Sequence, residues 1–468
     1  MSMAERVTAK AEAPTGRKLR PYAAQAAQFR SGKTTPREFL ENCLEAIARL
    51  EPSVGAFIEM NIERARRDAD AASARWRGGK PLSAIDGMPV GIKDIIETAD
   101  MPTGQGSPLW KGFRTRRDAA SVFALREAGA VILGKTSTTE FAASHPWPGT
   151  FNPHDRTRSP GGSSSGSAAA VGAGMIPAAL GTQVVGSILR PASYCGCVGF
   201  KPTVGAINRG GAYDQLSQSV HGSLAASLAD AWLVVRAIAE RAGGDPGYVG
   251  LQGEVNFARR AKPARLALLE TGGWKETSDG ARKAFEAAKR RLTEAGVVLG
   301  SRGDDPLVEA AEREMAEALP LTRRINEWEG RWPLNTYADT DIGKLSALSQ
   351  ERLRNAVNMT QADYAALIAQ RERARAAFAK AAERYEAFVT LSATGAAPVG
   401  FATTGNPVMN APASYLGVPA ISLPVLADEG LPLGLQLMGG AGRDAALFET
   451  AAWVVTALGR SDLIGAGE

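Results

Sequence analysis

Cysteine and histidine are scarce in this sequence, and their scarcity excludes several classes of protein. Three cysteines, Cys43, Cys195 and Cys197, occur among 468 residues, which is too few for the disulfide framework of a small secreted domain. Cys195 and Cys197 are separated by a single residue, which is not the spacing of zinc ligands, and only three histidines are present. We therefore expect no structural metal site.

Long apolar runs and blocks of basic residues are also missing. No segment contains the ~18 uninterrupted apolar residues that a membrane-spanning helix needs, and no apolar stretch near the start suits a signal peptide. The net charge of +5 is spread thinly along the chain, without a Lys/Arg block interleaved with aromatics, so we expect no nucleic-acid partner. Because 44% of the residues are hydrophobic and 22% charged, we expect a globular, cytoplasmic protein.

The N-terminal region predicts helices. Thr35 is a suitable N-cap, Pro36 suits the first helical position, and Glu38 completes a capping box. Apolar residues then recur at three- and four-residue spacing, which indicates a buried stripe that includes Cys43. We expect residues 1–75 to form a helical arm packed on the core of the protein.

From about residue 85, short apolar runs alternate with helical segments. Residues 88–96 predict a strand that leads into a turn, residues 118–130 a helix capped by Asp118, and residues 131–134 a buried strand. Further strands are expected at 266–269, 388–391, 420–423 and 433–437, and helices at 279–296 and 361–386, the latter capped by Thr360 and Asp363. This alternation predicts an α/β sheet covered by helices on both faces.

The domain organisation follows from the same alternation. No internal repeat and no linker between independent domains is recognisable, so residues 76–468 are expected to form a single domain. Residues 300–360 are richer in charge and weaker in periodicity, which indicates a helical insertion around the sheet.

The stretch SPGGSSSGSAAAVGAG (159–174) is unusually rich in serine and glycine. It is not a linker, because it runs into an apolar helical segment at 167–180 that must be buried. It is not a phosphate-binding loop either, because it lacks the lysine of the G-x-x-x-x-G-K-[ST] motif. A serine-rich turn at the start of a helix remains, which gathers hydroxyl groups and N–H donors at one place.

A second such turn, GTQVVGSILRPAS, places Ser187 directly after a glycine. The three histidines lie in unremarkable contexts, so if Ser187 is a nucleophile the residues favour a lysine as its base. Lys93 follows an apolar strand, where burial depresses the pKa of an amine. The alternative is that Lys93 pairs with Asp94 or Glu97 on the surface, and that Ser163 and Ser187 only cap helices.

Four segments together resemble the amidase signature family in order and spacing: GMPVGIKD (87–94), GGSSSGSAAAVGAG (161–174), GTQVVGSILRPASYCGCVGFKPTVG (181–205) and NAPASYLGVPAISLP (410–424). The resemblance extends from about residue 20 to about residue 460. It implies a single large mixed, mostly parallel sheet flanked by helices. It also implies acyl transfer through a Ser–cis-Ser–Lys triad that needs neither a metal nor a cofactor.

The resemblance assigns roles to individual residues. Ser187 corresponds to the nucleophile, Lys93 to the lysine, and Ser163 to the bridging serine whose peptide bond with Gly162 is cis. Ser163 and Ser187 are 24 positions apart, which is the family's usual spacing and selects Ser163 from its serine neighbours. The family's oxyanion hole corresponds to the backbone N–H groups of Val184, Val185, Gly186 and Ser187.

The nucleophile turn departs from the usual family pattern G-T-D-T-G-G-S-I-R. Gln183 replaces the acid and Arg190 lies one position later, as in a branch of the family that reads G-T-Q-T-A-G-S. Val184 and Val185 differ even from that branch, and a β-branched residue restricts the turn. Ser219 stands where the family usually carries an aspartate, and the loss of that carboxylate should weaken a local support without touching the triad.

The substrate is less well determined. Lys135 in GKTSTTEF corresponds to a structural lysine of the family. The candidate pocket residues are large apolar side chains of a kind that more often belongs to the core than to a pocket, namely Trp147, Trp328, Trp332, Phe401 and Met409. If several of them face the site, an aryl or hydrophobic amide, anilide or carbamate is favoured. The loop-like segment 144–158 is expected to border the entrance.

Three functions remain open on the sequence. The favoured one is an amidohydrolase that cleaves a C–N bond of a small amide, anilide or carbamate, as a monomer or homodimer with no membrane or nucleic-acid partner. The second is an amidotransferase A-type subunit that produces ammonia from glutamine for partner subunits. The third is a catalytically idle binding protein on the same scaffold. Intact Lys93, Ser163 and Ser187 favour an enzyme, whereas the two valines of the turn leave the idle alternative open.

Overall fold

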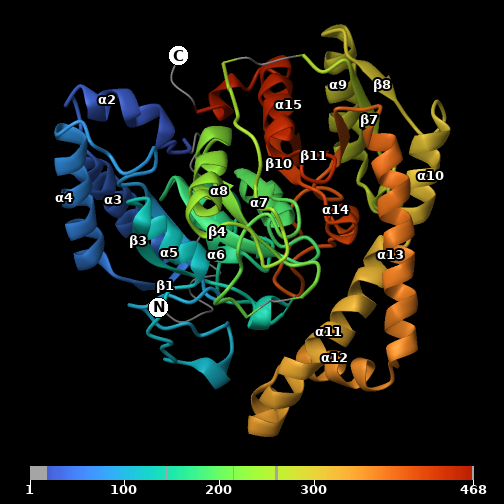
Figure 1. Ribbon diagram of the computed structural model, residues 1–468, viewed down its shortest axis with the longest axis horizontal. Helices are drawn as coiled ribbons and strands as arrows, with labels where there is room; N and C mark the ends of the chain where they lie inside the picture. Colours follow the sequence, from blue (N-terminus) through green and yellow to red (C-terminus); the bar gives the residue numbers. More distant parts are fainter. Residues whose placement is uncertain (1–17, 144, 214–215, 259–261, 466–468) are drawn as a thin grey trace.

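A single sheet forms the centre of the protein (Figure 1). The computed structural model describes residues 18–143, 145–213, 216–258 and 262–465, so residues 1–17 of the expected helical arm lie outside the described residues. Within these ranges, 11 strands pair in the order β1-β3-β2-β4-β6-β5-β10-β11-β9-β7-β8. The strands are β1 (Phe57–Met60), β2 (Pro89–Lys93), β3 (Val131–Thr136), β4 (Ala178–Gln183), β5 (Val198–Lys201), β6 (Val220–Ala225), β7 (Arg265–Leu268), β8 (Val298–Gly300), β9 (Ala387–Leu391), β10 (Ala420–Asp428) and β11 (Leu431–Met438).

The sheet is mixed, and the sequence-based expectation that it is mostly parallel is wrong. Four neighbouring pairs are parallel, β2 with β3 and β4, and β7 with β8 and β9, whereas the six other described pairs are antiparallel. One cause is the hairpin between β10 and β11, whose two-residue turn Glu429–Gly430 has positive φ at both positions. Such turns join antiparallel strands, whereas parallel strands need a long crossover.

The expected α/β class is confirmed, because helices connect and cover the strands. The α-helices are α2 (Ala26–Arg30), α3 (Pro36–Val54), α4 (Ile62–Arg77), α5 (Ala120–Glu127), α6 (Ser165–Gly172), α7 (Leu189–Cys195), α8 (Leu228–Ala242), α9 (Asp279–Glu294), α10 (Pro306–Met315), α11 (Ala318–Asp341), α12 (Ala347–Val357), α13 (Gln361–Ala382), α14 (Ala411–Leu416) and α15 (Asp444–Ala457). The strands and helices predicted between 266 and 437 are all present, with ends that differ by a few residues.

Apolar side chains fill both faces of the sheet. Along β4, Ala178 and Leu180 belong to a core with α5, α8 and α15, whereas Ala179 between them belongs to a second core with α6 and α7. Successive side chains of a strand point to opposite faces, so β4 is covered by helices on both sides. Its polar end, Thr182 and Gln183, is therefore held inside the molecule.

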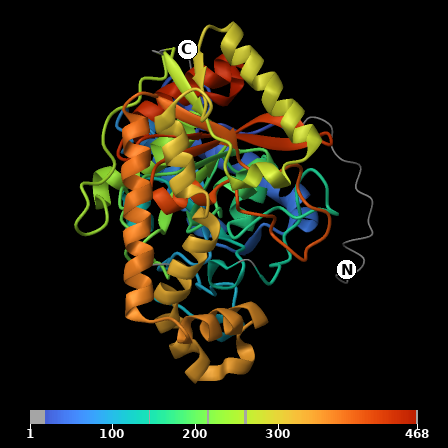
Figure 2. The ribbon, with the colours of Figure 1, turned by 90° about the vertical axis from the view of Figure 1, so that its right-hand side faces the viewer.

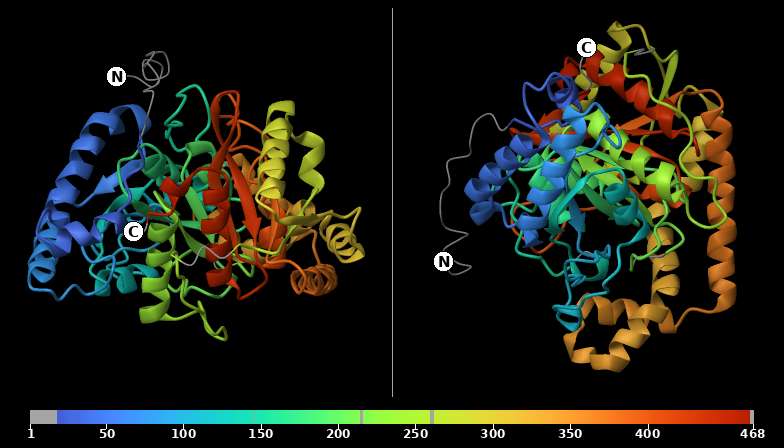
Figure 3. Two further views of the ribbon diagram at one scale, coloured as in Figure 1. Left: turned by 90° about the horizontal axis from the view of Figure 1, so that it is seen from above. Right: turned by 60° about the vertical axis from the view of Figure 1, so that its left-hand side comes forward.

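The N-terminal helices cover one end of the sheet, at the left in Figure 3. The predicted capping box is confirmed: Thr35 Oγ1 accepts from the Glu38 N–H, and Glu38 Oε2 accepts from the Thr35 N–H, each at 3.1 Å. The same region also supplies β1, which pairs with β3. The arm is thus joined to the sheet by backbone hydrogen bonds as well as by packing.

Two helix predictions differ from the structure. Helix α5 begins at Ala120 without a side-chain cap, because the Asp118 carboxylate instead accepts from the Ala99 N–H and from Arg126 Nε. The predicted apolar helix 167–180 is also too long. Helix α6 ends at Gly172, and the chain then turns through Gly174, with φ +74°, and Pro177 into β4, since proline interrupts a helix.

Residues 300–360, where a helical insertion is expected, contain α10, α11 and α12, and α13 follows them. Helices α10 to α13 lie at the β8 end of the sheet, and α11 with α12 extends beyond the body of the protein (Figure 2). No helix in the described part of the chain combines the length and apolar content that crossing a membrane requires.

Candidate active site

Lys93 is the last residue of β2, in the middle of the parallel part of the sheet. Its side chain has no exposed surface, and its Nζ donates to Ser163 Oγ at 2.7 Å and to Thr182 Oγ1 at 2.8 Å. Thr182 lies at the end of β4, which runs parallel to β2. The carboxyl ends of adjacent parallel strands meet at one edge of a sheet, where α/β proteins place their sites. Lys93 is therefore a buried site residue and does not lie on the surface.

The serine-rich stretch forms a wall around this lysine. Ser164 Oγ bonds to the Thr182 carbonyl, Ser165 Oγ donates to the Gly161 carbonyl, and Ser167 Oγ donates to the Leu180 carbonyl. These three hydroxyls hold the chain in place. Ser163 is the serine that contacts Lys93, and the Gly162–Ser163 peptide bond is cis, as the resemblance implies.

Gln183 shapes the second turn, which runs from residue 183 to residue 189. Its Oε1 accepts from the N–H groups of Ile188 and Leu189 at 2.9 and 3.1 Å. Its Nε2 donates to the Val185 carbonyl at 3.2 Å and to Ser414 Oγ at 3.0 Å. Since a carboxylate only accepts hydrogen bonds, the glutamine makes contacts that the acid usual at this position cannot make.

Four consecutive N–H groups of this turn are left available. Among the described residues, none of the N–H groups of Val184, Val185, Gly186 and Ser187 donates a hydrogen bond within the protein. Val184, Val185 and Ser187 are half-buried. Unused N–H donors at a partly accessible turn are suited to hold a developing negative charge.

Ser187 is joined to the serine-rich stretch by a backbone hydrogen bond. Its carbonyl accepts from the Ser164 N–H at 3.3 Å, so the turn that carries Ser187 lies directly beside the serine-rich stretch. The structure thus brings Lys93 and Ser163 into direct contact. It holds the half-buried Ser187 beside them through the backbone of Ser164, the residue that follows Ser163.

Arg190 is a further residue of the site that the sequence flagged only for its shifted position. The buried guanidinium donates from Nη2 to the Gly162 carbonyl at 2.7 Å and to Thr404 Oγ1 at 2.9 Å. Desolvation lowers the pKa of Arg190 to about 10, and the positive charge of Arg323 acts in the same direction. Arg190 therefore ties the serine wall to the loop before α14.

His221 and Ser219 lie on the opposite side of β4. His221 pairs with Thr182 across the antiparallel strands β4 and β6, and its Nδ1 lies 3.1 Å from Ser121 Oγ. Burial lowers the pKa of His221 to about 3, so its imidazole is neutral at ordinary pH. Ser219 is buried, and its hydroxyl, which replaces the usual aspartate, contacts no hydrogen-bond partner in the described residues.

Lys135 is buried one strand away, on β3. Its Nζ donates to the carbonyls of Ile96 and Pro102 and to Thr103 Oγ1, at 2.7 to 3.1 Å. It also forms an ion pair with Asp94 at 3.1 Å. These contacts tie the segment after β2 to β3, as expected of a structural lysine.

The five candidate pocket residues do not form one wall. Trp147 stacks on Phe401 with ring centroids 4.0 Å apart, and Phe401 lies three positions before Thr404, which contacts Arg190. Met409 has no exposed surface and belongs to the core, whereas Trp332 on α11 is 76% exposed at the surface. Trp328 stacks on Tyr364 of α13. Trp147 and Phe401 remain the pair linked to the site.

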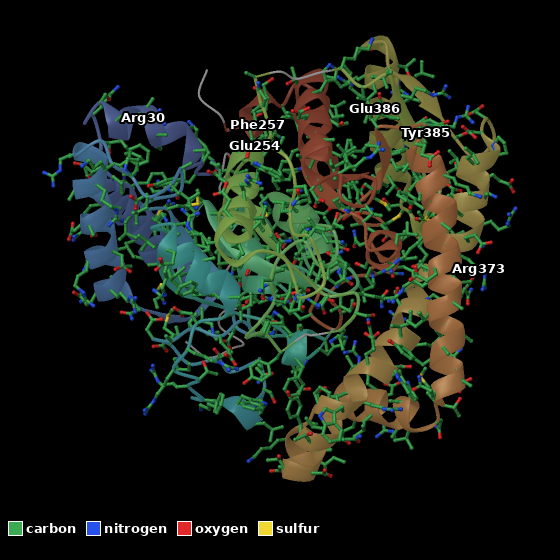
Figure 4. All side chains as sticks on the ribbon, viewed as in Figure 1. Arg30, Glu254, Phe257, Arg373, Tyr385 and Glu386 are labelled. Carbon is green, nitrogen blue, oxygen red and sulfur yellow. The ribbon has the colours of Figure 1, made fainter. Side chains whose placement is uncertain are left out.

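A groove lies away from these residues. It measures about 600 Å³ and lies between α2, α8 and the segment 254–257, where Figure 4 labels Arg30, Glu254 and Phe257. None of the residues expected at the site lines it. In the described residues, no three His, Cys, Asp or Glu side chains gather in a way that holds a metal ion.

Comparison with known proteins shows which sequences this chain is similar to. Residues 38–448 match the profile of the family described as Amidase, and this range includes Lys93, Ser163 and Ser187. The A subunit of the glutamyl-tRNA(Gln) amidotransferase of Chloroflexus aggregans is 32% identical over 457 residues, covering 87% of this chain and 90% of that protein.

Solved structures show the same similarity in three dimensions. A chain from an inhibitor-bound complex, described as a vestigial complex that reveals the origins of an s-triazine catabolic enzyme, superposes with a TM-score of 0.82 at 26% identity, covering 94% of this chain and 99% of that chain. The peptide amidase of Stenotrophomonas maltophilia superposes with a TM-score of 0.73 at 30% identity, covering 92% of this chain and 95% of that chain. The similarity in fold therefore extends over nearly the whole molecule.

Proposed function

This chain belongs to the amidase family, and from that premise we propose that it hydrolyses a C–N bond of a small amide, anilide or carbamate through an acyl-enzyme on Ser187. The observation that carries the proposal is the buried contact between Lys93 Nζ and Ser163 Oγ, with Ser187 held beside it by the Ser164 backbone. A lysine and two serines in this order form a path along which a proton can move.

In the proposed reaction the proton moves in one direction and then returns. Burial disfavours the charged form of an amine, so Lys93 acts as the neutral base. Ser187 Oγ attacks the substrate carbonyl while its proton passes to Ser163 Oγ and the Ser163 proton passes to Lys93 Nζ. The C–N bond then breaks, and the leaving nitrogen takes a proton back through Ser163. Water hydrolyses the ester on Ser187 by the same path.

The negative charge that develops on the carbonyl oxygen of the substrate must be stabilised by hydrogen-bond donors. The unused N–H groups of Val184, Val185, Gly186 and Ser187 supply them in this proposal. Donors that are already oriented before the reaction stabilise the transition state more than the ground state, and each is worth about 3 kcal/mol. This supports acyl transfer and disfavours an idle scaffold.

A second candidate is an ammonia-producing component of a larger complex that acts on glutamine. It is favoured by the 32% identity to the A subunits of glutamyl-tRNA(Gln) amidotransferases over most of both chains. The two candidate functions differ in whether the protein needs partner subunits. A stand-alone hydrolase turns over its substrate by itself, whereas an amidotransferase component forms a stable complex with other subunits and releases ammonia from glutamine.

The test compares wild type with Ser187→Ala on p-nitroacetanilide, p-nitrophenyl carbamates, simple aliphatic amides and L-glutamine, with amine or ammonia release as the readout. A matched control is Ser73→Ala, which removes another buried hydroxyl, one bonded to the Ala69 carbonyl in α4. We expect wild type and the control to release amine and Ser187→Ala to release none. Turnover of glutamine alone supports the second candidate, and equal activity in Ser187→Ala excludes both.

A further inference from the structure

We propose that Gln183 and Ser414 are positioning residues that fix the Val185–Gly186 peptide, so that the Gly186 N–H faces the reacting carbonyl of the substrate. This inference rests on the proposed acyl-enzyme function and adds two residues to it. Neither side chain touches the substrate, and each acts through the backbone of the nucleophile turn. The two residues are 231 positions apart in the sequence.

Three polar atoms form a closed triangle behind the turn. Gln183 Nε2 donates to Ser414 Oγ at 3.0 Å and to the Val185 carbonyl at 3.2 Å. Ser414 Oγ donates to the same carbonyl at 2.9 Å. The side chains of Gln183 and Ser414 are fully buried, and in an environment of low dielectric such hydrogen bonds hold a group firmly. The direction of the Val185 carbonyl is therefore set by two donors.

The direction of this carbonyl decides where the next N–H points. In a trans peptide the C=O and the N–H lie in one plane and point in opposite directions. Because the Val185 carbonyl points towards Ser414 on α14, the Gly186 N–H points away from α14. The following peptide is fixed as well, since the Gly186 carbonyl accepts from the Arg190 N–H at 3.1 Å. Two consecutive N–H groups are thus oriented before any substrate is present.

The side chain of Gln183 is itself held in place. Its Oε1 is committed to the N–H groups of Ile188 and Leu189, so its amide plane is held by the start of α7. Both hydrogens of its Nε2 are used within the triangle. Ser414 lies in the short buried helix α14, and its bond to the Val185 carbonyl connects the turn to that helix. A carboxylate at position 183 has no hydrogen to donate.

The test distinguishes an effect on the direction of the Gly186 N–H from a general effect on the packing of the turn. Ser414→Ala removes one donor to the Val185 carbonyl, Gln183→Glu removes the other but keeps the acceptor, and Ser414→Thr keeps the hydroxyl. Ser73→Ala is again the matched control. The kcat and KM for p-nitroacetanilide are measured for each protein, together with the affinity for phenylboronic acid, which forms a tetrahedral adduct with a reactive serine.

Removal of one oxyanion-hole donor lowers kcat about 10²–10³-fold. A donor that is present but misoriented should therefore lower kcat by a smaller factor. We expect kcat to fall about 10-fold in Ser414→Ala and further in Gln183→Glu, with KM changed less than about 2-fold and melting temperatures close to wild type. Affinity for phenylboronic acid should fall in parallel with kcat. Ser414→Thr should retain wild-type values.

Three results would overturn the positioning role. They are a Ser414→Ala protein with wild-type kcat and boronic acid affinity, a change confined to KM, and an equal loss in Ser414→Thr. Failure of the proposed function looks different, because wild type itself then releases no amine and binds no boronic acid through Ser187. That result also overturns the inference that rests on it.

Discussion

The Nζ of Lys93 lies 2.7 Å from Ser163 Oγ, and neither side chain has any exposed surface. The contact joins the end of strand β2 to the serine-rich turn before α6, across 70 positions of sequence. Because both side chains are buried, the proposed proton transfer from Ser163 to Lys93 takes place away from the protein surface. Substitutions in this pair, or in the groups that hold it, should therefore change the measured activity or stability of the protein.

Lys93→Met should abolish most of the amidase activity. The thioether matches the length of the lysine stem but cannot accept a proton, and a general base contributes about 10²–10⁴-fold to the rate. The measurement is kcat for p-nitroacetanilide near neutral pH, with circular dichroism as a check on folding. In Lys93→Ala, added ethylamine should restore part of the rate. A Lys93→Met protein with a kcat close to that of wild type would show that the lysine is not the base.

Gly186→Ala should disturb the turn while the rest of the fold remains. A Cβ at this position would lie 2.7 Å from Asn410 Oδ1 and 3.0 Å from Pro407 Cβ, so either the turn or these neighbours must shift. We expect kcat to fall about 10-fold or more, since misplaced oxyanion donors lose much of their value. The control is Gly330→Ala on α11, where the added carbon has no neighbour within 4 Å apart from the adjacent residues and backbone of its own helix. Equal activity of the two variants would contradict the prediction.

Lys201 should make the stability of the protein depend on pH. Its amine is fully buried between the carbonyls of Pro202 and Val418, and desolvation lowers its pKa from 10.5 to about 7, although the charge of Asp444 opposes this. The unfolded state binds this proton more tightly than the folded state, so the free energy of unfolding rises between about pH 7 and pH 10.5.

Lys201→Met removes that dependence. Relative to wild type, the variant should gain most stability below about pH 7, where the folded wild type must bury the charge, and the gain should shrink as the pH approaches 10.5. Urea unfolding of both proteins at intervals across this range of pH measures the difference. A difference that does not change with pH would show that Lys201 titrates normally.

Glu140→Ala should destabilise helix α12, which together with α11 extends beyond the body of the protein. The buried carboxylate accepts from the Ser346 N–H at 3.1 Å and from Ser349 Oγ at 2.6 Å, and it also contacts the Ser346 hydroxyl at the start of α12. Hydrogen bonds to a buried charge are worth about 1.5–3 kcal/mol each. Amide hydrogen exchange over residues 346–357 should therefore become faster by about tenfold or more. Exposed Glu351→Ala is the control, and unchanged exchange in Glu140→Ala contradicts the prediction.

Local patterns in the sequence determined much of the secondary structure. The capping boxes at Thr35 and Thr360 involve residues three positions apart, and the strands near 131, 388 and 420 follow from runs of apolar residues. The exceptions depend on contacts outside the local pattern. Asp118 does not cap α5, because it is occupied by Ala99 and Arg126, and neither partner is evident from the residues beside it.

The sequence by itself also determined which segments carry the candidate chemistry. The resemblance of four segments to the amidase signature family, in order and spacing, selected Lys93, Ser163 and Ser187. The residues alone left open whether Lys93 lies on the surface and which of the neighbouring serines it contacts. Those questions concern side chains that are distant in sequence, and no periodicity within a segment reports on such pairs.

Only the tertiary structure decided how the segments meet. It placed Lys93 against Ser163 and Thr182, joined Gln183 to Ser414, buried Met409 and left Trp332 exposed. It also showed that most neighbouring strands run antiparallel. The reason is common to all of these: the hydrogen-bond partner of a strand or a buried polar group is set by which elements pack together, and that depends on the free energy of the whole fold.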